Sequence, residues 1–255
     1  YIGYECVKVI GNYWIALPIA VIAGALIASM IEFLFMRFLA KLHINSPISA
    51  VAPIIVTLGL LGIIRASIAF IWGGQELRIA APLSNIGYSI GDKTLVFSPM
   101  KLMILFSVLI VLLILGIIFQ RTNLGLALKA SSFAPEISKL SGLKVDLIRN
   151  IGWALSGGVA ALAGLLQTAN GSGSISPEAL EFAILLVSGF IAAVIGGLES
   201  LIGAVFGGLL LGTLVSFALM YIDGGLFFIA PLFILIMVLI FRPRGLFAPK
   251  AGRHA

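Results

Sequence analysis

The sequence has few charged residues and few of the side chains on which enzymes and metal sites depend. Only 10% of the 255 residues are charged and 61% are hydrophobic, whereas water-soluble chains carry about 25% charged residues. The one cysteine, Cys6, excludes an internal disulfide and any site with several cysteine ligands. The two histidines, His43 and His254, lie far apart in the sequence. The composition therefore excludes an ordinary soluble domain and predicts no metal site.

The sequence also lacks the motifs of ATP hydrolysis and of proteolysis within a membrane. No stretch matches the phosphate loop G-x-x-x-x-G-K-[ST]. No set of acidic residues or metal ligands is placed as a membrane protease requires. We therefore expect no catalytic residue and no cofactor on this chain, and we do not expect it to be an enzyme.

Apolar runs make up most of the chain. A helix needs about 20 residues to cross the hydrocarbon core of a membrane, and two of the runs are short for a crossing. The sequence thus predicts an all-α fold, a polytopic transmembrane helical bundle with about seven membrane segments in a single domain over residues 1–255. The runs cover residues 14–36, 50–71, 102–119, 151–169, 182–196, 201–221 and 226–241.

The longest polar interruption, residues 121–150, holds five of the sixteen Lys and Arg residues. If this loop is cytoplasmic, eleven basic residues lie inside, four lie outside, and Arg65 falls within a run. Such a bias predicts that the loop and the C-terminus face the cytoplasm. It also explains the net charge of +6 without nucleic-acid binding.

A short helix is predicted inside the loop. Pro135 suits its first turn, and Gly142 lies where it would end. Phe133, Ile137 and Leu140 recur at i, i+4 and i+7, which gives the helix an apolar stripe. We expect the loop to be structured, and to be the part through which a component outside the membrane acts on the helices inside it.

Polar residues within apolar runs are costly in a membrane, and they mark candidate pathway positions. Glu32 lies close to the inner end of its run, where it would reach the interface or pair with Arg37. Arg65 lies deeper, and it either faces a polar pathway or pairs with a carboxylate on another helix. Thr57 and Gly59, downstream of a proline in the same run, are candidates for a loosened helix that lines the pathway.

Four glycines in one run are spaced for close helix packing. They form two G-x-x-x-G motifs, which let helix backbones approach each other in lipid. The contacts predicted from this spacing are either within one subunit or with a second copy. The four are Gly203, Gly207, Gly208 and Gly212.

Several stretches together resemble the membrane subunits of bacterial ATP-binding cassette (ABC) importers for branched-chain amino acids and related compounds, in particular the shorter of the two permease types. Their order and spacing follow those of the family. They are VTLGL at 56–60, LGLALKASSFAPEISKLSGLKVD at 124–146, AAVIGGLESLIGAVFGGLLLG at 192–212, and FRPRGLF at 241–247.

The resemblance implies a site for a cytoplasmic ATPase. Such permeases carry a cytoplasmic motif with an acidic residue and a glycine six positions later, matched here by Glu136 and Gly142. Ile137 and Ser138 stand where two alanines are usual. The residues implied to couple to the ATPase are Phe133, Pro135, Glu136, Ile137, Leu140 and Gly142. From the residues alone, a helix that lies on the lipid surface is an equal alternative for this segment.

The resemblance further implies partners and a substrate. The expected partners are cytoplasmic ATPase subunits that bind the ATP, a second permease subunit, an extracytoplasmic substrate-binding protein, and membrane lipid. The expected substrate is a branched-chain or related hydrophobic amino acid, with amides, urea and aromatic acids equally compatible. Family members begin with a further span, so we expect residues to precede Tyr1. The alternatives are a secondary transporter driven by an ion gradient, which would show inverted repeats, and a membrane scaffold without transport.

Overall fold

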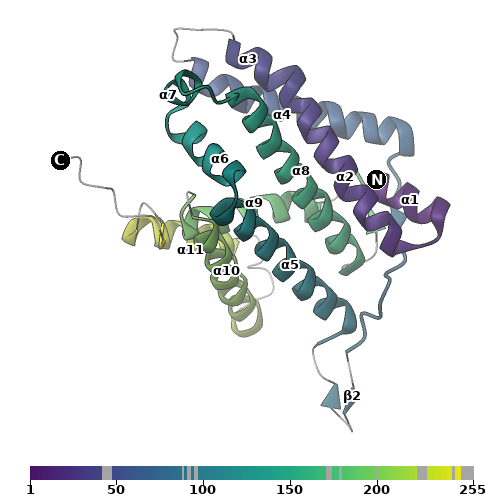
Figure 1. Ribbon diagram of the computed structural model, residues 1–255. Coiled ribbons are helices and arrows are strands. Elements are labelled where there is room, and N and C mark those ends of the chain that lie inside the picture. Colours follow the sequence, from purple (N-terminus) through teal and green to yellow (C-terminus); the bar gives the residue numbers. More distant parts are fainter. Residues whose placement is uncertain are drawn as a thin grey trace. The chain divides into compact units, whose positions relative to one another are not determined.

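The computed structural model describes residues 1–41, 48–87, 89–90, 93–94, 97–170, 174–177, 180–198, 200–222, 229–242 and 245–247 (Figure 1). The chain forms two compact units, Tyr1–Glu178 and Ala179–Ala255. The elements of the first unit are α1 (Ile2–Ile10), α2 (Tyr13–Ile31), the π-helix η1 (Glu32–Met36), α3 (Arg37–Lys41), α4 (Ile48–Trp72), β1 (Leu77–Arg78), β2 (Ser89–Ile90), β3 (Lys93–Thr94), α5 (Pro99–Arg121), α6 (Asn123–Phe133), α7 (Pro135–Leu140), α8 (Val145–Asn170) and β4 (Ser174–Ile175). Those of the second unit are α9 (Leu180–Gly196), α10 (Leu201–Tyr221) and α11 (Ile229–Phe241).

Every predicted apolar run is helical wherever the structure describes it, which confirms the all-α polytopic bundle. Among the described residues, five helices are long and apolar enough to cross a membrane, and two apolar helices are shorter, Phe182–Gly196 and Ile229–Phe241. The first residues of the last predicted run, 226–228, lie outside the described residues. The long helices are Tyr13–Leu39, Val51–Trp72, Pro99–Arg121, Val145–Asn170 and Ile202–Tyr221.

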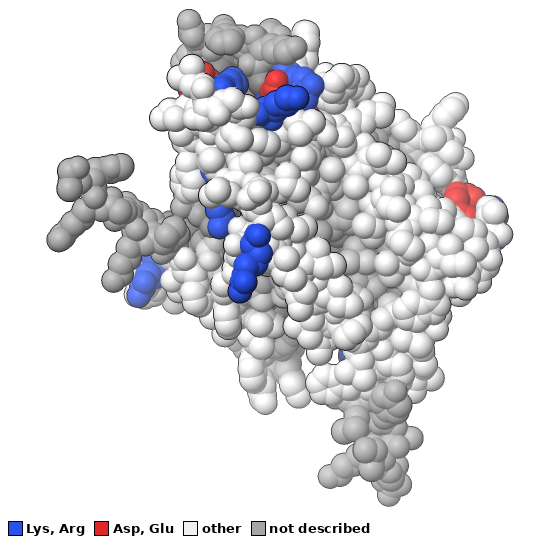
Figure 2. All heavy atoms as spheres, in the orientation of Figure 1, with Lys and Arg blue, Asp and Glu red and all other residues white. Residues whose placement is uncertain are grey.

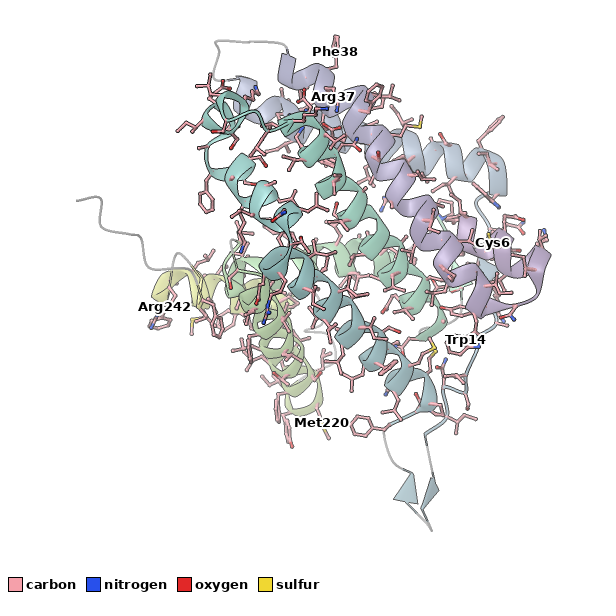
Figure 3. All side chains as sticks on the ribbon, viewed as in Figure 1. Cys6, Trp14, Arg37, Phe38, Met220 and Arg242 are labelled. Carbon is pink, nitrogen blue, oxygen red and sulfur yellow. The ribbon has the colours of Figure 1, made fainter. Side chains whose placement is uncertain are left out.

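The first long helix is continuous through three segments: α2 and α3 are α-helical, and η1 between them is π-helical. The side chain of Asn12 caps its start by accepting a hydrogen bond from the backbone N–H of Trp14 at 2.9 Å. Figure 3 shows Trp14 at one end of this helix and Arg37 and Phe38 at the other. Aromatic and basic side chains at the two ends of a span are typical anchors at membrane interfaces.

The core of the first unit is the antiparallel pair α2 and α8, which Figure 1 shows side by side. The helices touch backbone to backbone, because small residues face each other. A Cβ on Gly24 would lie 2.5 Å from the Cβ of Ala161 and 2.7 Å from the carbonyl oxygen of Gly157. A Cβ on Gly157 would in turn overlap the Cβ of Ala28. Only glycine fits at these two crossing points.

The opposite end of this pair from Glu32 is closed by α1 and by short strands. The Tyr13 hydroxyl donates to the carbonyl of Leu165 at 3.1 Å. Strand β1 pairs antiparallel with β4, with Leu77 opposite Ile175. Strands β1 and β4 belong to two segments that the charge pattern predicts on one side of the membrane, and they meet at one end of the first unit.

The second unit is built on α9 and α10, whose backbones also touch. A Cβ on Gly203 would overlap the carbonyl of Gly196, and one on Gly207 would overlap the carbonyl of Ala192. Gly208 has only ordinary van der Waals room, with the Cβ of Ala192 at 3.9 Å, and the space around Gly212 is open. Of the four predicted packing glycines, two therefore make close contacts within the chain.

The FRPRGLF segment ends in a contact that caps α9. The backbone N–H of Leu246 donates to the carbonyl of Ile195 at 2.8 Å, and that of Phe247 donates to the carbonyl of Gly196 at 3.1 Å. The last carbonyls of a helix have no partner within the helix, and these two bonds satisfy them. The ring of Phe247 stacks on that of Phe206, with centroids 5.3 Å apart. Leu246 and Phe247 therefore pack against the helices of the second unit.

The glycines of α10 permit a matched stability test. We expect Gly203→Leu to destabilise the second unit by roughly 3 kcal/mol, because the new side chain would collide with backbone atoms that cannot rotate away. Gly212→Leu should change stability by less than about 0.5 kcal/mol, since it extends into open space. Thermal unfolding of the two purified variants in the same detergent measures the difference, and equal midpoints would contradict it.

Candidate functional site

The structure places the predicted short helix at Pro135–Leu140, as α7. Pro135 occupies its first position, and Gly142 follows its end with a φ of +82°. The N–H of Gly142 donates to the carbonyl of Lys139, and that of Leu143 donates to the carbonyl of Ser138, each at 3.0 Å. This pair of bonds is a Schellman motif, which ends a helix at a left-handed residue.

The two sides of α7 differ in character. Ser138 is buried, with only 5% of its surface exposed. The three predicted apolar residues are exposed, Phe133 74%, Ile137 66% and Leu140 88%, but Phe133 is the last residue of α6, so only Ile137 and Leu140 lie on α7 and the predicted stripe is not on one helix. Glu136 and Lys139 are exposed and pair at 3.5 Å. We call Phe133, Ile137 and Leu140, which form an exposed apolar surface on the polar segment, the coupling face, after the role that the sequence analysis predicts for them.

The polar segment 121–150 is largely helical. It contains α6, α7 and the first turns of α8, which begins at Val145. The hydroxyl of Thr122 caps α6 by accepting a bond from the N–H of Gly125 at 3.2 Å. Figure 2 shows charged side chains of both signs at the end of the first unit where α3 and α7 lie, beside a wide uncharged surface.

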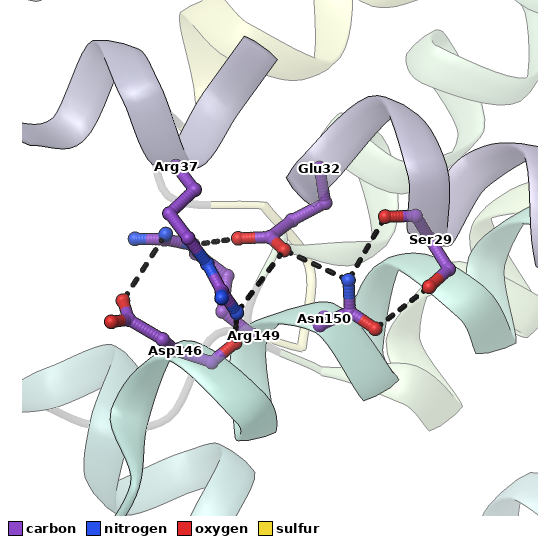
Figure 4. Close-up of polar contacts among 6 residues, drawn as sticks. All are labelled: Ser29, Glu32, Arg37, Asp146, Arg149 and Asn150. Carbon is purple, nitrogen blue, oxygen red and sulfur yellow. Dashed lines mark hydrogen bonds and ion pairs between the residues drawn. The ribbon is translucent and has the colours of Figure 1, made fainter. Parts of the chain in front are cut away.

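A second polar feature lies beside the coupling face, where η1 meets the start of α8 (Figure 4). Glu32 is completely buried. The Nε of Arg149 donates to its Oε1 at 2.7 Å, and the Nδ2 of Asn150 donates to its Oε2 at 2.9 Å. Arg37, the predicted partner, is more distant, at 3.9 Å. The predicted pair of Glu32 with Arg37 is therefore present, and Arg149, which the sequence did not indicate, is the closer partner.

The surroundings of Glu32 extend this arrangement into a network. The Ser29 hydroxyl donates to the Oδ1 of Asn150 at 2.8 Å, and Nδ2 of Asn150 donates to the Ser29 carbonyl at 2.9 Å. An NH2 group of Arg149 reaches Asp146 at 3.3 Å, and Arg37 donates to the Asp146 carbonyl at 3.3 Å. Two carboxylates and two guanidinium groups balance in charge. We call Ser29, Glu32, Arg37, Asp146, Arg149 and Asn150 the Glu32 network.

Sequence reasoning placed Arg149 only among the basic residues of the loop and missed its role in this network. A buried carboxylate in a membrane helix needs a cation, and the chain offered Arg37 nearby and Arg149 far along the sequence. The signal that could have pointed to Arg149 is its place near the start of a predicted span, at the same side of the membrane as Glu32. The π-helix was not predicted, and segments of this kind occur often at functional sites.

The pathway candidates all lie on α4. The Thr57 hydroxyl donates to the carbonyl of Ile54 at 2.9 Å, within the same helix. A Cβ on Gly59 would meet no atom within 4 Å, and Arg65 is exposed. Among the residues that the structure describes, no hydrogen bond or ion pair joins these three to the Glu32 network or to α7. Their role as pathway residues stays a prediction.

A pocket of about 530 Å³ lies between α6, α7 and α8, with Pro135, Arg149 and Trp153 in its wall. It adjoins the Glu32 network through Arg149. Within the described ranges, no group of three His, Cys, Asp or Glu side chains is close enough to hold a metal ion.

These features define the class of the protein, a multi-pass α-helical membrane protein with a structured polar segment. A sequence model of the family described as "branched-chain amino acid transport system / permease component" matches residues 1–241, and the chain belongs to this family. It is thus a transport component, and the resemblance drawn from the motifs is confirmed.

Three curated relatives are similar to the chain. A probable branched-chain amino acid transport permease of Methanocaldococcus jannaschii is 28% identical over 228 residues, which cover 87% of this chain and 68% of that protein. A high-affinity branched-chain amino acid transport system permease of Pseudomonas aeruginosa is 27% identical over 197 residues, 76% of this chain and 63% of that one. A fructose import permease of Rhizobium meliloti is 30% identical over 175 residues, 63% and 46% of the two chains. No solved structure gives a significant match.

Proposed function

We propose that the chain is the membrane-spanning subunit of an ATP-binding cassette importer that carries branched-chain or related hydrophobic amino acids across the bacterial cytoplasmic membrane. The single observation that carries the proposal is the coupling face, in which Phe133 at the end of α6 and Ile137 and Leu140 on α7 are exposed, and Pro135 and Gly142 fix the ends of α7. Membership of the permease family supports it. The substrate class rests on the printed names of two relatives, while the third is named for fructose.

The proposed orientation places residues 121–150 and the C-terminus in the cytoplasm. The charge bias of the sequence supports it. The count of basic residues on each side depends on successive spans crossing the membrane in alternate directions. The contact between Glu32 and Arg149 supports this alternation, because it puts the end of the first long helix beside the start of α8.

In the proposed mechanism, α7 inserts its coupling face into a groove on a cytoplasmic ATPase subunit. Closure of the ATPase pair on binding ATP displaces α7. The displacement biases the membrane helices between two arrangements, open to one side or to the other. A second permease subunit completes the pathway, a binding protein outside delivers the substrate, and Thr57, Gly59 and Arg65 are the proposed lining residues of this chain.

Reconstitution tests the proposal. The full-length protein, purified with the ATPase subunit that co-purifies with it, is placed in lipid vesicles with a candidate binding protein and radiolabelled leucine. ATP-dependent uptake is expected. Uptake that needs an ion gradient and no ATP would favour the secondary transporter instead. The absence of both uptake and an associated ATPase would favour the scaffold.

The positive φ of Gly142 makes a graded prediction for coupling. A Cβ at this position would meet no atom within 4 Å, so a substitution strains only the backbone. The left-handed conformation costs about 1–2 kcal/mol for an ordinary residue, and asparagine tolerates it better. We expect ATP-driven uptake to fall in the order Gly142, Gly142→Asn, Gly142→Val, at equal protein levels in the membrane. Equal uptake by the asparagine and valine variants would contradict the prediction.

A further inference from the structure

We propose that α2 and α8 move as one rigid lever during transport, and that Glu32 and Arg149 are the positioning residues that hold the lever together at the end where α7 is attached. The inference rests on the proposed function, because it assigns the path by which a displacement of α7 enters the membrane. It predicts which helix interface stays closed throughout the transport cycle.

The connection between α7 and α8 is short and hydrogen-bonded. Only four residues separate Leu140 from Val145. The Schellman bonds fix Gly142 and Leu143 to α7, and the N–H of Val145 donates to the carbonyl of Leu143 at 2.9 Å. Val145 and Ser138 are both buried. A displacement of α7 is therefore transmitted to the start of α8, because the connection between them is short and hydrogen-bonded.

That first turn is fastened to α2 and η1 by the Glu32 network. Both carboxylate oxygens of Glu32 are satisfied from α8, one by Arg149 at 2.7 Å and one by Asn150 at 2.9 Å. Sliding α8 along α2 would leave a fully buried carboxylate without its partners, which is among the costliest changes a protein interior can undergo. The network thus resists relative movement of the two helices at this end.

Deeper in the membrane, the same two helices are held by shape. Gly24 and Gly157 bring the backbones into contact, with Ala28 and Ala161 beside them. The atoms nearest to a Cβ on either glycine are backbone atoms and alanine Cβ atoms, which cannot change rotamer to accommodate a movement of one helix along the other. Helices α4 and α5, by contrast, have many exposed apolar side chains.

A disulfide across the lever provides the first test. A Cβ on Gly158 would lie 3.7 Å from the Cβ of Ala25, within the range of native disulfides. Ala25→Cys and Gly158→Cys are introduced together in a Cys6→Ser background, in the reconstituted importer. Oxidation is expected to leave ATP-driven uptake within about twofold of the reduced protein, because a rigid contact loses nothing when it is cross-linked. A loss of uptake on oxidation that a reductant reverses would overturn the proposal.

The second test measures coupling in Glu32→Gln. The ratio of substrate taken up to ATP hydrolysed is expected to fall about tenfold, and the Ala25–Gly158 disulfide should restore it by replacing the lost fastening. Glu76→Gln, at an exposed position in another segment, is the matched control and should keep the wild-type ratio. A merely structural role for Glu32 would reduce the amount of protein and leave the ratio unchanged, and that result would overturn the proposal.

The two failures are distinguishable. If the wild-type complex shows no ATP-driven uptake, the proposed function fails. If the wild-type complex transports normally but the oxidised cysteine pair does not, the function stands and the rigid lever is wrong.

Discussion

Replacement of Ile137 and Leu140 together by serine is expected to abolish ATP-driven transport while leaving the amount of protein in the membrane unchanged. Both side chains are largely exposed, so their loss costs the fold less than about 0.5 kcal/mol each. As anchors in a groove of the ATPase, they would together contribute roughly 3 kcal/mol to binding, which is more than a hundredfold in affinity. Uptake and the amount of ATPase that co-purifies with the permease measure the effect.

The control is a second pair of exposed apolar residues outside the polar segment. Val9 and Ile86 are 81% and 79% exposed, so Val9→Ser with Ile86→Ser makes a similar change in surface polarity. This variant should keep both the ATPase and the uptake. If the variant at Ile137 and Leu140 also keeps them, α7 is not the coupling element.

The same variant separates docking from an interfacial position on lipid. A helix that only lies on the membrane surface gains from buried apolar area, so serine at both positions would weaken its contact with lipid. Labelling of a cysteine in α7 by a water-soluble reagent would then rise, while the ATPase would stay bound. Loss of the ATPase, which also uncovers the cysteine in α7, is the result expected for docking.

Much of the fold followed from the sequence because the bilayer permits few solutions. Backbone groups within the hydrocarbon must be satisfied internally, so long apolar runs such as 102–119 become helices wherever they occur. The short helix was equally readable, since Pro135 and Gly142 are local signals that act within one turn. Helix α7 begins and ends within one residue of the prediction, 135–141.

Contacts between residues on different helices could not be predicted from the sequence in the same way. Arg37 is close to Glu32 in the sequence, but the rotation and tilt of α8 put Arg149 nearer. The glycine motifs show why. Gly208 and Gly212 have the same spacing as Gly203 and Gly207, yet Gly208 has ordinary van der Waals room beside Ala192 and Gly212 meets no atom within 4 Å. Which face of a helix meets a neighbour depends on the packed arrangement, and spacing alone does not determine it.

Gly157→Leu is expected to prevent the first unit from folding. Helices α2 and α8 touch at this residue, where a Cβ on Gly157 would overlap both the Cβ of Ala28 and the backbone carbonyl of Gly24. Overpacking usually costs about 1–3 kcal/mol, and the cost should exceed this range because backbone atoms cannot move aside without separating the helices. Separation would also break the bonds of Arg149 and Asn150 to the buried Glu32, whose exposed fraction is zero. The two costs add at one interface, so we expect little folded protein to be recovered.

Gly116→Leu is the matched control, since Gly116 lies within the long apolar helix α5 and a Cβ there would meet no atom within 4 Å. Both variants add the same side chain to a membrane helix and raise its hydrophobicity equally, so insertion into the membrane should be unaffected in both. Size-exclusion chromatography of the solubilised proteins, followed by thermal unfolding, should show a monodisperse Gly116→Leu protein and an aggregated or strongly destabilised Gly157→Leu protein. If Gly157→Leu unfolds at the same temperature as the control, α2 and α8 do not make the backbone contact on which the Glu32 network depends.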